Sequence, residues 1–534
     1  MMAEIFPGLH YFTDAQISAR RETLQAQVVV YGGTAAGVFA AVAARRLGLS
    51  TLLLHPGKHL GGLTTGGLGW TDHGNKSVIS GMARRFYQDV GRAYGLGEVW
   101  SFEPHVAAEV MQRMLAEADV PVQTGAYVES VTMDGRRIAM ITMLGGLQVH
   151  GDVFVDASYE GDLLALAGVS HTVGREGNAA YGETLNGIQV RDLHQFSHPV
   201  DPYVRPGDAG SGLLPGIMDE DLSLRQGQSD SRVQAYCFRM CMTDDPALRV
   251  DWARPAGFNP DDYVLATRWF QGQKDTYNEQ LRESGANGVP EKFDILAPRT
   301  AGGFHKTDTN NHGPVSSDFI GQSWDWPRSN YARRERIFQN HVRYQAGFYW
   351  HMANNPEIPE RYRVAYRRWG LARDEFTATG HWPHQLYVRE ARRLIGDYVL
   401  TEHDCRLTRR CPDPVAMGSY AMDSHNCSRF IKMDAGQARV LNEGDVQVYC
   451  AGPYGISYRS MVPRSGECEN LVVPVCVSAS HIAYGSVRME PVFMALGEVV
   501  AHAAHCALGT RCAMQAVDYS LLRSRLVAAG MVLG

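Results

Sequence analysis

The sequence predicts an α/β fold in which a parallel sheet, covered by helices on both faces, is interrupted by an inserted α+β domain. Residues 27–57 run as an apolar β-branched segment, a glycine turn, an alanine-rich helix and a second apolar segment, which is the order of a βαβ unit. Strands that are apolar on both sides indicate a sheet covered on both faces. Residues 446–508 again read as buried strands followed by a helix rich in small residues. We therefore predict a Rossmann-like α/β domain that is discontinuous in sequence.

Taken in order, the chain divides into four predicted segments. Short strands between Val120 and Ser158, with a turn at Asp134–Gly135, return to the first sheet. Around residues 192–232 the helix and strand periods vanish and Pro, Gly, Asp and Ser dominate, which indicates a boundary. The segments are 25–190 for the first part of the discontinuous domain, 191–439 for a substrate or cap domain, 440–515 for the second part of the discontinuous domain, and 516–534 for a C-terminal helical tail.

Composition excludes several classes of protein. With 45% hydrophobic residues, the 534-residue chain is long enough to bury large cores. Lys and Arg number 51 against 57 Asp and Glu, so no basic excess exists to neutralise a nucleic acid. The N-terminus lacks the pattern of a secretory signal, which favours the cytoplasm. The apolar stretch 491–508 carries Glu498, His502 and His505, so we expect no membrane span.

The ten cysteines show no CxxC pair and no spacing typical of a metal site or a disulfide framework. We interpret them as buried, reduced thiols, and we expect no metal centre.

The glycine turn of the βαβ unit is a GxxxxG in which Thr34 replaces the second glycine of GxGxxG. Gly32 permits the tight turn, Gly37 permits close helix packing, and the helix N-terminus offers N–H groups to a pyrophosphate. The Thr34 hydroxyl is a candidate donor to a phosphate oxygen. The alternative is a simple tight connection between strand and helix.

His55 ends the second strand, where a dinucleotide site usually has an acid that holds the ribose hydroxyls. A neutral imidazole can bond one hydroxyl but lacks the two-oxygen grip of a carboxylate. The alternative is that His55 only caps the strand in solvent.

A second glycine tract follows, with five glycines and two threonines in residues 61–69. Such density is costly in backbone entropy unless another group must approach closely. A flavin dinucleotide, whose pyrophosphate and ribityl chain must be reached by main chain, explains it. The alternative is a mobile surface loop.

Over about residues 27–508, the chain resembles the FAD-dependent oxidoreductases with a glutathione-reductase-like dinucleotide fold. The segments that carry this resemblance are VVVYGGTAAG, HPGKHLGGLTTGGLGWTD, FVDASYEGDLLALAGVSHTVGRE, KTDTNNHGPVSSDFIG, LYVREARRLIGDYVL, YGISYRSMVP and SASHIAYGSVRMEPVFMALGE. The resemblance implies FAD as cofactor, and it does not identify a substrate.

The resemblance also implies that the discontinuous domain is a Rossmann-like FAD/NAD(P)-binding domain, and it implies which residues contact FAD. The first glycine tract would face the pyrophosphate, and the second would line the pyrophosphate and the flavin. The backbone of Val128 would meet adenine, and the strand end at Asp156 and Ala157 would close over the dinucleotide. Residues 486–492 would bring a helix start to the flavin carbonyl edge, where its dipole favours negative charge. Arg488 either adds a charge there or pairs with Glu490. The implied set is Gly32, Gly33, Thr34, Ala35, Ala36, Gly37, His55, Gly61, Gly62, Leu63, Thr64, Thr65, Gly66, Gly67, Val128, Asp156, Ala157, Arg488, Met489, Pro491 and Val492.

Four polar residues are candidates for catalysis. His481 is the first choice as general base, because an imidazole titrates near neutrality and can take a hydroxyl proton. His73, after the second glycine tract, is the next. Arg389 and Arg393, which we expect one helical turn apart with Glu390 between them, either clamp a carboxylate or sugar hydroxyl or form an ion-paired support. Each histidine has the alternative of a structural role.

No second GxGxxG lies between a strand and a helix in the middle region, so we expect electrons to come from the substrate itself. The leading hypothesis is hydride removal from a hydroxyl- or amine-bearing carbon of a small molecule, with sugars or polyols as plausible substrates. The alternatives are a flavin-dependent monooxygenase and a non-catalytic flavin-binding or electron-transfer subunit. Dioxygen, a quinone and a carrier protein remain open as electron acceptor.

Overall fold

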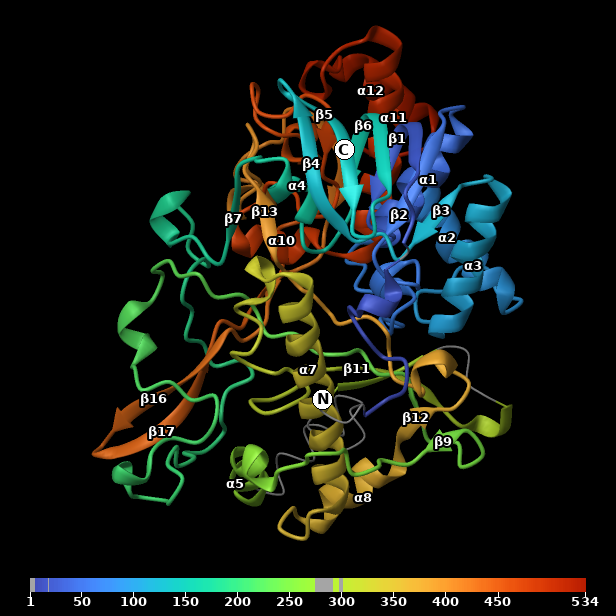
Figure 1. The fold of residues 1–534 in the computed structure, drawn as a ribbon. Helices are drawn as coiled ribbons and strands as arrows, with labels where there is room; N and C mark the ends of the chain where they lie inside the picture. The colour runs from blue at the N-terminus through green and yellow to red at the C-terminus, as the bar shows by residue number, and fades with distance from the viewer. Residues whose placement is uncertain (1–4, 18, 274–291, 297–300) are drawn as a thin grey trace.

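The computed structural model describes residues 5–17, 19–273, 292–296 and 301–534. Its main sheet runs in the order β3-β2-β1-β6-β5-β4, with β20 also paired to β6 (Figure 1). The strands are β1 (Thr23–Tyr31), β2 (Thr51–His55), β3 (Val122–Thr124), β4 (Val128–Asp134), β5 (Arg137–Met143), β6 (Gln148–Asp156) and β20 (Leu471–Val472).

The pairing of this sheet matches the predicted βαβ unit. Strands β3, β2, β1, β6 and β20 pair in parallel, whereas β4, β5 and β6 form an antiparallel meander. Helix α1 (Ala35–Arg46) connects β1 to β2, and its first ten residues are buried. The Rossmann-like α/β fold that the sequence predicts is confirmed, and β20 returns to β6 after more than 300 intervening residues, as a discontinuous domain requires.

Helix α11 (Glu490–Thr510) brings the C-terminal part of the chain against α1 (Figure 1). It is long and apolar enough to cross a membrane, but 83% of its most apolar window is buried inside the protein, so it serves as a core helix. The other helices around the sheet are α2 (Gly81–Ala93), α3 (Pro104–Glu117), α4 (Asp162–Leu166), α10 (His481–Val487) and α12 (Tyr519–Ala528).

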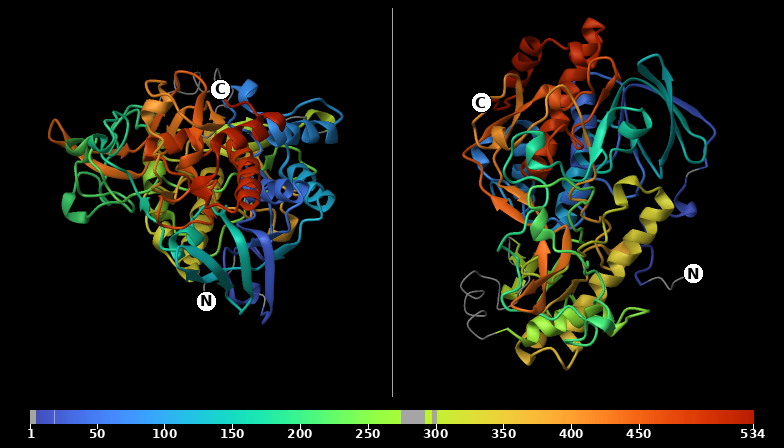
Figure 2. Two further views of the ribbon diagram at one scale, coloured as in Figure 1. Left: turned by 90° about the horizontal axis from the view of Figure 1, so that it is seen from above. Right: turned by 90° about the vertical axis from the view of Figure 1, so that its left-hand side faces the viewer.

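The middle of the chain forms a second lobe below the main sheet in Figure 1, and the side view in Figure 2 shows the same two-lobed arrangement. A mostly antiparallel sheet there runs in the order β10-β11-β8-β12-β9, and the 24-residue helix α7 (Tyr331–Asn354) lies beside it. The elements are β8 (Met242–Thr243), β9 (Arg249–Val250), β10 (Lys292–Ile295), β11 (Lys306–Asn310), β12 (Gly370–Ala372), α5 (Val264–Gln271) and α8 (Glu360–Arg368).

Short strand pairs join the two lobes or extend from them. They are β7 (His171–Val173) with β13 (Arg392–Leu394), β14 (Pro414–Gly418) with β19 (Tyr454–Ser457), β15 (Met422–Ser424) with β18 (Val446–Val448), and the hairpin β16 (Ser428–Asp434) with β17 (Gln437–Glu443). A short helix, α9 (Glu402–Cys405), follows β13.

The prediction of a helix around Arg389 and Arg393 is wrong. Residues 385–391 have no regular secondary structure, and β13 begins at Arg392. Both arginines are buried and bind partners from distant parts of the chain. These tertiary contacts override the local helix propensity, which is a weak preference.

The packing of α1 on α11 predicts opposite effects for two glycine-to-alanine substitutions in the same helix. A Cβ at Gly497 would lie 2.3 Å from the carbonyl oxygen of Ala36, whereas a Cβ at Gly509 would meet nothing within 4 Å. We expect Gly497→Ala to lower the free energy of unfolding by ~1–3 kcal/mol. Gly509→Ala should leave it unchanged or raise it by up to ~1 kcal/mol. Urea unfolding of both variants measures this, and equal effects would contradict the packing described.

Candidate functional site

The first glycine turn is a tight crossing of backbones at the carboxyl ends of β1 and β6. Gly32 has a φ of +104°, and a Cβ there would lie 2.5 Å from the backbone N of Ser158. A Cβ on Gly37 would lie 1.8 Å from the Gly32 carbonyl oxygen. Only glycine fits at either position, as a dinucleotide-binding turn requires.

The Thr34 side chain is hydrogen-bonded within this turn. Its hydroxyl donates to the carbonyl of Ala157 at 2.7 Å and accepts the N–H of Gly37 at 3.3 Å. The Thr34 hydroxyl, a predicted donor to a phosphate oxygen, is therefore already hydrogen-bonded within the protein. Its acceptor is Ala157, the residue expected to close over the dinucleotide.

The two glycine tracts are joined to each other. The N–H of Gly61 donates to the carbonyl of Gly33 at 2.7 Å, and a Cβ on Gly62 would lie 2.3 Å from the Tyr159 hydroxyl. The second half of the tract packs on the inserted domain, because Cβ atoms on Gly66 and Gly67 would meet Gln385 and the Arg239 carbonyl. The tract thus connects the cofactor domain to the inserted domain.

His55 faces the first turn. Its Nδ1 accepts the N–H of Gly33 at 3.0 Å, and burial lowers its pKa to about 4. A neutral imidazole accepts this N–H without bringing a charge to the turn. His55 is half-buried and acts as a hydrogen-bond acceptor for the turn, so it does more than cap the strand in solvent.

A cavity of about 90 Å³ lies beside the turn. One wall holds an unpaired polar atom: Nε2 of His384 is buried without a hydrogen-bond partner among the described residues, and its ring stacks on that of His59 at 4.0 Å. The lining residues are Gly8, Leu9, His10, Tyr11, Gln16, Gly32, Thr34, His55, Pro56, Gly57, Lys58, His59, Gly62, Ser158, Tyr159, Glu160, Phe338, Thr379, His384, Gln385 and Leu386.

The N-terminal segment forms one side of this cavity and is docked on α7. The Glu335 carboxylate accepts the N–H groups of Tyr11 and Phe12 at 2.8 and 2.9 Å, and its other oxygen lies 2.8 Å from Nδ1 of His10. Gln339 donates to the Leu9 carbonyl at 2.7 Å. No sequence motif indicated this docking.

The predicted adenine contact at Val128 is occupied by protein groups. The Val128 N–H donates to the Tyr31 hydroxyl at 3.4 Å, and the Tyr331 hydroxyl donates to the Val128 carbonyl at 2.8 Å. An adenine contact here would have to replace both hydroxyls.

Asp156, the other strand-end prediction, stabilises the turn that follows it. Its carboxylate accepts the N–H and hydroxyl of Ser158 and the N–H of Leu164 at 2.6–3.0 Å. The side chain is fully buried, and burial raises its pKa to about 6.

The start of α11 reaches the second glycine tract through Glu490. Its carboxyl group binds the Thr64 hydroxyl at 2.6 Å and the Tyr159 hydroxyl at 2.8 Å, and Tyr159 also accepts the N–H of Leu63. Burial raises the pKa of Glu490 to about 7. Its neighbours Met489, Pro491 and Val492 are buried in the core.

Arg488 points away from Glu490, so the alternative in which these two residues pair is not found. Its guanidinium donates to the Tyr387 hydroxyl at 2.9 Å and to the backbone carbonyl of Asp423 at 3.1 Å. Tyr387 directly follows Gln385 and Leu386, which line the cavity, so this cluster borders the cavity from the inserted domain.

Three arginines surround the ring of Tyr387. The guanidinium carbons of Arg389, Arg488 and Arg239 lie 4.2, 5.6 and 5.7 Å from the ring centroid. Three buried polar atoms of this cluster have no hydrogen-bond partner within the described part of the chain: Oδ1 of Asp423, Nε of Arg488 and Nη1 of Arg239. Since buried polar groups are normally paired, these atoms indicate a polar ligand.

A histidine–carboxylate pair that the sequence analysis missed adjoins this cluster. Nδ1 of His425 lies 2.8 Å from the carboxylate of Asp318, and Nε2 lies 3.8 Å from Oδ2 of Asp423. Arg389 donates to the other Asp318 oxygen at 2.9 Å. Burial, followed by the charge of Arg389, lowers the pKa of His425, so the ring is neutral and able to accept a proton.

The two predicted catalytic histidines lie in other surroundings. His481 is buried, with Nδ1 2.7 Å from Glu390 and Nε2 3.1 Å from the Ser424 hydroxyl, so both ring nitrogens are engaged. His73 is partly exposed, and its Nδ1 lies 2.7 Å from the Gly74 carbonyl. Neither lines the cavity beside the glycine turn, and His425 does not line it either.

The predicted arginines are ion-paired supports. Arg389 pairs with Asp318, and Arg393 pairs with Glu176 and Glu390. Both arginines are at most 2% exposed.

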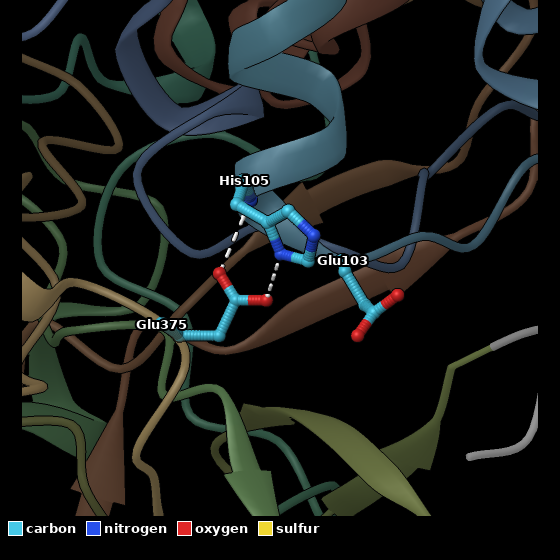
Figure 3. A group of neighbouring side chains, drawn as sticks. All are labelled: Glu103, His105 and Glu375. Carbon is cyan, nitrogen blue, oxygen red and sulfur yellow. Dashed lines mark hydrogen bonds and ion pairs between the residues drawn. The ribbon is translucent and has the colours of Figure 1, made fainter. Parts of the chain in front are cut away.

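Glu103, His105 and Glu375 form a separate cluster of potential metal ligands, drawn in Figure 3. Nδ1 of His105 lies 2.6 Å from Glu375. The ammonium of Lys306 lies 2.5 Å from Glu103 and 3.3 Å from Glu375. Lys306 thus supplies the positive charge that a metal ion would bring.

Comparison with known proteins identifies one family. The model of the family described as FAD dependent oxidoreductase matches residues 27–526. No curated protein matches the chain.

Solved structures match only part of the chain. They include bacillithiol disulfide reductase Bdr from Staphylococcus aureus, with 15% identity over 25% of this chain and 38% of that chain at a TM-score of 0.19. A 3-ketosteroid-Δ4-(5α)-dehydrogenase from Rhodococcus jostii RHA1 matches with 14% identity over 27% and 48%, at 0.20. A flavin-containing monooxygenase from Stenotrophomonas maltophilia matches with 19% identity over 31% and 45%, at 0.20. The chain spans less than half the length of each, so these likenesses do not bear on its substrate.

The buried Glu490 predicts a pH dependence of stability. Because its folded pKa of about 7 exceeds the ordinary value, its stabilising contribution is full at low pH and is lost as the pH rises through about 7. We expect the free energy of unfolding to fall between about pH 5 and about pH 8 by ~2 kcal/mol more in the wild type than in Glu490→Gln. Urea unfolding at both pH values measures the difference. Equal pH slopes would show that Glu490 does not titrate as its burial requires.

Proposed function

The chain belongs to the FAD-dependent oxidoreductase family, and from that membership we propose that it removes a hydride from a hydroxyl- or amine-bearing carbon of a small molecule. FAD, when bound, supplies a flavin ring that accepts the hydride at N5. Sugars and polyols are the first substrates to test.

The glycine turn and the tract after it are suited to holding the pyrophosphate of this cofactor. At Gly32 and Gly62 a Cβ would meet Ser158 and Tyr159, so these positions present only backbone to the cavity that they line. The N-terminus of α1 opens beside it, and main-chain N–H groups at a helix start favour a pyrophosphate. The unpaired Nε2 of His384 adds one polar group in the wall.

The base in this proposal is His425. Asp318 holds its Nδ1, which fixes the tautomer that leaves Nε2 as the acceptor, as in other histidine–carboxylate pairs. Nε2 takes the substrate's hydroxyl or amine proton. Asp318 stays ionised, since Arg389 and His425 lower its pKa against the effect of burial.

We infer the substrate class from the buried polar atoms around Tyr387 that have no hydrogen-bond partner among the described residues. Arg488 and Arg239 each offer a buried unpaired donor, and Asp423 offers a buried unpaired acceptor. A hydroxyl group donates one hydrogen bond and accepts others, so a compound with neighbouring hydroxyls satisfies both kinds of atom.

We also propose that the enzyme acts in the cytoplasm. All ten cysteines lie in the described part of the chain and none is disulfide-bonded, which is typical of proteins from a reducing compartment.

The test of this function is anaerobic addition of hydroxyl- and amine-bearing compounds, sugars and polyols first, to the FAD-loaded protein. Loss of the oxidised flavin absorbance with one compound supports the proposal and names the substrate. Reduction only by an added electron donor, followed by oxygen transfer, would instead favour the monooxygenase alternative. The reduced enzyme is then mixed with dioxygen, a quinone or a carrier protein to find the acceptor.

Substitution of the proposed base predicts a loss of rate without loss of cofactor. We expect His425→Gln to slow flavin reduction by the identified substrate ~10²–10⁴-fold at unchanged FAD content, and Asp318→Asn to slow it in the same direction. His171→Gln, on exposed β7, is the matched control and should keep the wild-type rate. Stopped-flow absorbance measures each rate. Full activity of His425→Gln together with an inactive, FAD-loaded His481→Gln would return the role of base to His481.

A further inference from the structure

A second cavity, of about 250 Å³, lies on the other side of α7 from the cofactor cavity. Phe338 lines the cofactor cavity, whereas Asn340, Arg343 and Tyr344 line the second one. At 3.6 residues per turn, these three positions lie on the opposite face of the helix from Phe338. The remaining lining residues are Pro215, Gly216, Asp262, Tyr263, Leu265, Ala266, Val315, Phe319, Ile320, Gln322 and Arg429.

Arg429 is a buried cation in this wall with no carboxylate partner among the described residues. It is 8% exposed. Its Nε donates to the side-chain oxygen of Asn442 at 3.0 Å, and its Nη2 donates to the carbonyl of Pro314 at 2.8 Å. Both acceptors are neutral, and no acceptor in the described part of the chain binds Nη1.

Other buried arginines of this protein are paired with carboxylates. Arg389 binds Asp318, Arg239 binds Asp308, and Arg175 binds Asp230. A buried charge is costly unless it is paired. Arg429 therefore stands out as a cation whose counter-charge the fold does not supply, and burial lowers its pKa.

Part of the cavity wall is apolar and flat. The rings of Phe319 and Tyr344 stack at 4.0 Å with an interplanar angle of 2°. Tyr263, Leu265 and Ala266 are at most 6% exposed and line the same space. An engineered apolar cavity of ~150 Å³ binds benzene, so this larger space is wide enough for one small ring.

Arg429 is the buried charge of this cavity. Asp262 also lines the cavity and is exposed. Asp262 disfavours a second negative group near its position, which points to a ligand with a single anionic group.

We propose that this cavity binds a small organic carboxylate, with the carboxylate on Arg429 and an apolar or aromatic body against Phe319 and Tyr344. The site is separated from the cofactor cavity by α7, and the proposal does not rest on the proposed oxidoreductase reaction.

Benzoate and its neutral analogue benzamide test the proposal by calorimetric titration of the full-length, FAD-loaded protein. We expect benzoate to bind the wild type, and benzamide to bind about tenfold or more weakly, because a hydrogen bond to a charged group is lost. Arg429→Gln should weaken benzoate by a similar factor and leave benzamide unchanged. Arg336→Gln, an exposed position on α7 that does not line the cavity, is the matched control and should bind both probes as the wild type does.

A second variant keeps the test decisive if Arg429→Gln does not fold. Gln322 lies at the exposed mouth of the cavity, so Gln322→Trp obstructs entry without altering the core, and it should abolish benzoate binding. No binding of benzoate to the wild type, equal binding of benzamide, or benzoate binding that survives both Arg429→Gln and Gln322→Trp would each overturn the proposal. The last result would place benzoate at another site, such as the one beside Tyr387.

Discussion

The close approach of four backbone segments at the start of α1 is the constraint on which the rest of the structure depends. Gly32 meets the end of β6, Gly37 meets Gly32, Gly33 bonds to Gly61, and Gly497 brings α11 onto Ala36. The contacts of Gly32, Gly37 and Gly497 each leave no room for a Cβ, so glycines set both the geometry of the cofactor cradle and the packing of α1 on α11. Because α11 is fixed in this way, Glu490 reaches Thr64 and Tyr159 at the second glycine tract.

Buried ion pairs dominate the region where the inserted domain meets the cofactor domain. Arg389 with Asp318 and Arg239 with Asp308 are almost completely buried. Such pairs contribute little net stability, because desolvation offsets most of their attraction, but loss of one partner is costly. We interpret them as positioning devices that hold Tyr387 and His425 in place, and the unpaired atoms beside them as the places where the substrate binds.

The sequence was informative where the signal is local. The βαβ unit, its glycine turn, the strand end at His55 and the long helix α11 follow from periodicity and glycine spacing, and the structure has them. The pair of His425 and Asp318 joins residues 107 apart in sequence, and no local pattern marks it. The helix expected around Arg389 failed because the arginines pair across the fold, and the docking of Tyr11 on Glu335 depends on a partner 324 residues away. Thr34 and Val128 show a related limit, since a residue can occupy the expected position while its polar groups are already bonded within the protein.

We propose that the flavin, when bound, lies between the glycine cradle and the cluster formed by Tyr387, Arg488 and His425. A crystal structure of the FAD-loaded protein tests it most directly. We expect the pyrophosphate to lie at the turn that begins with Gly32, and the flavin ring to lie within contact distance of the Tyr387 cluster. A flavin ring bound away from that cluster, with the unpaired atoms of Asp423, Arg488 and Arg239 far from both cofactor and substrate, would contradict it.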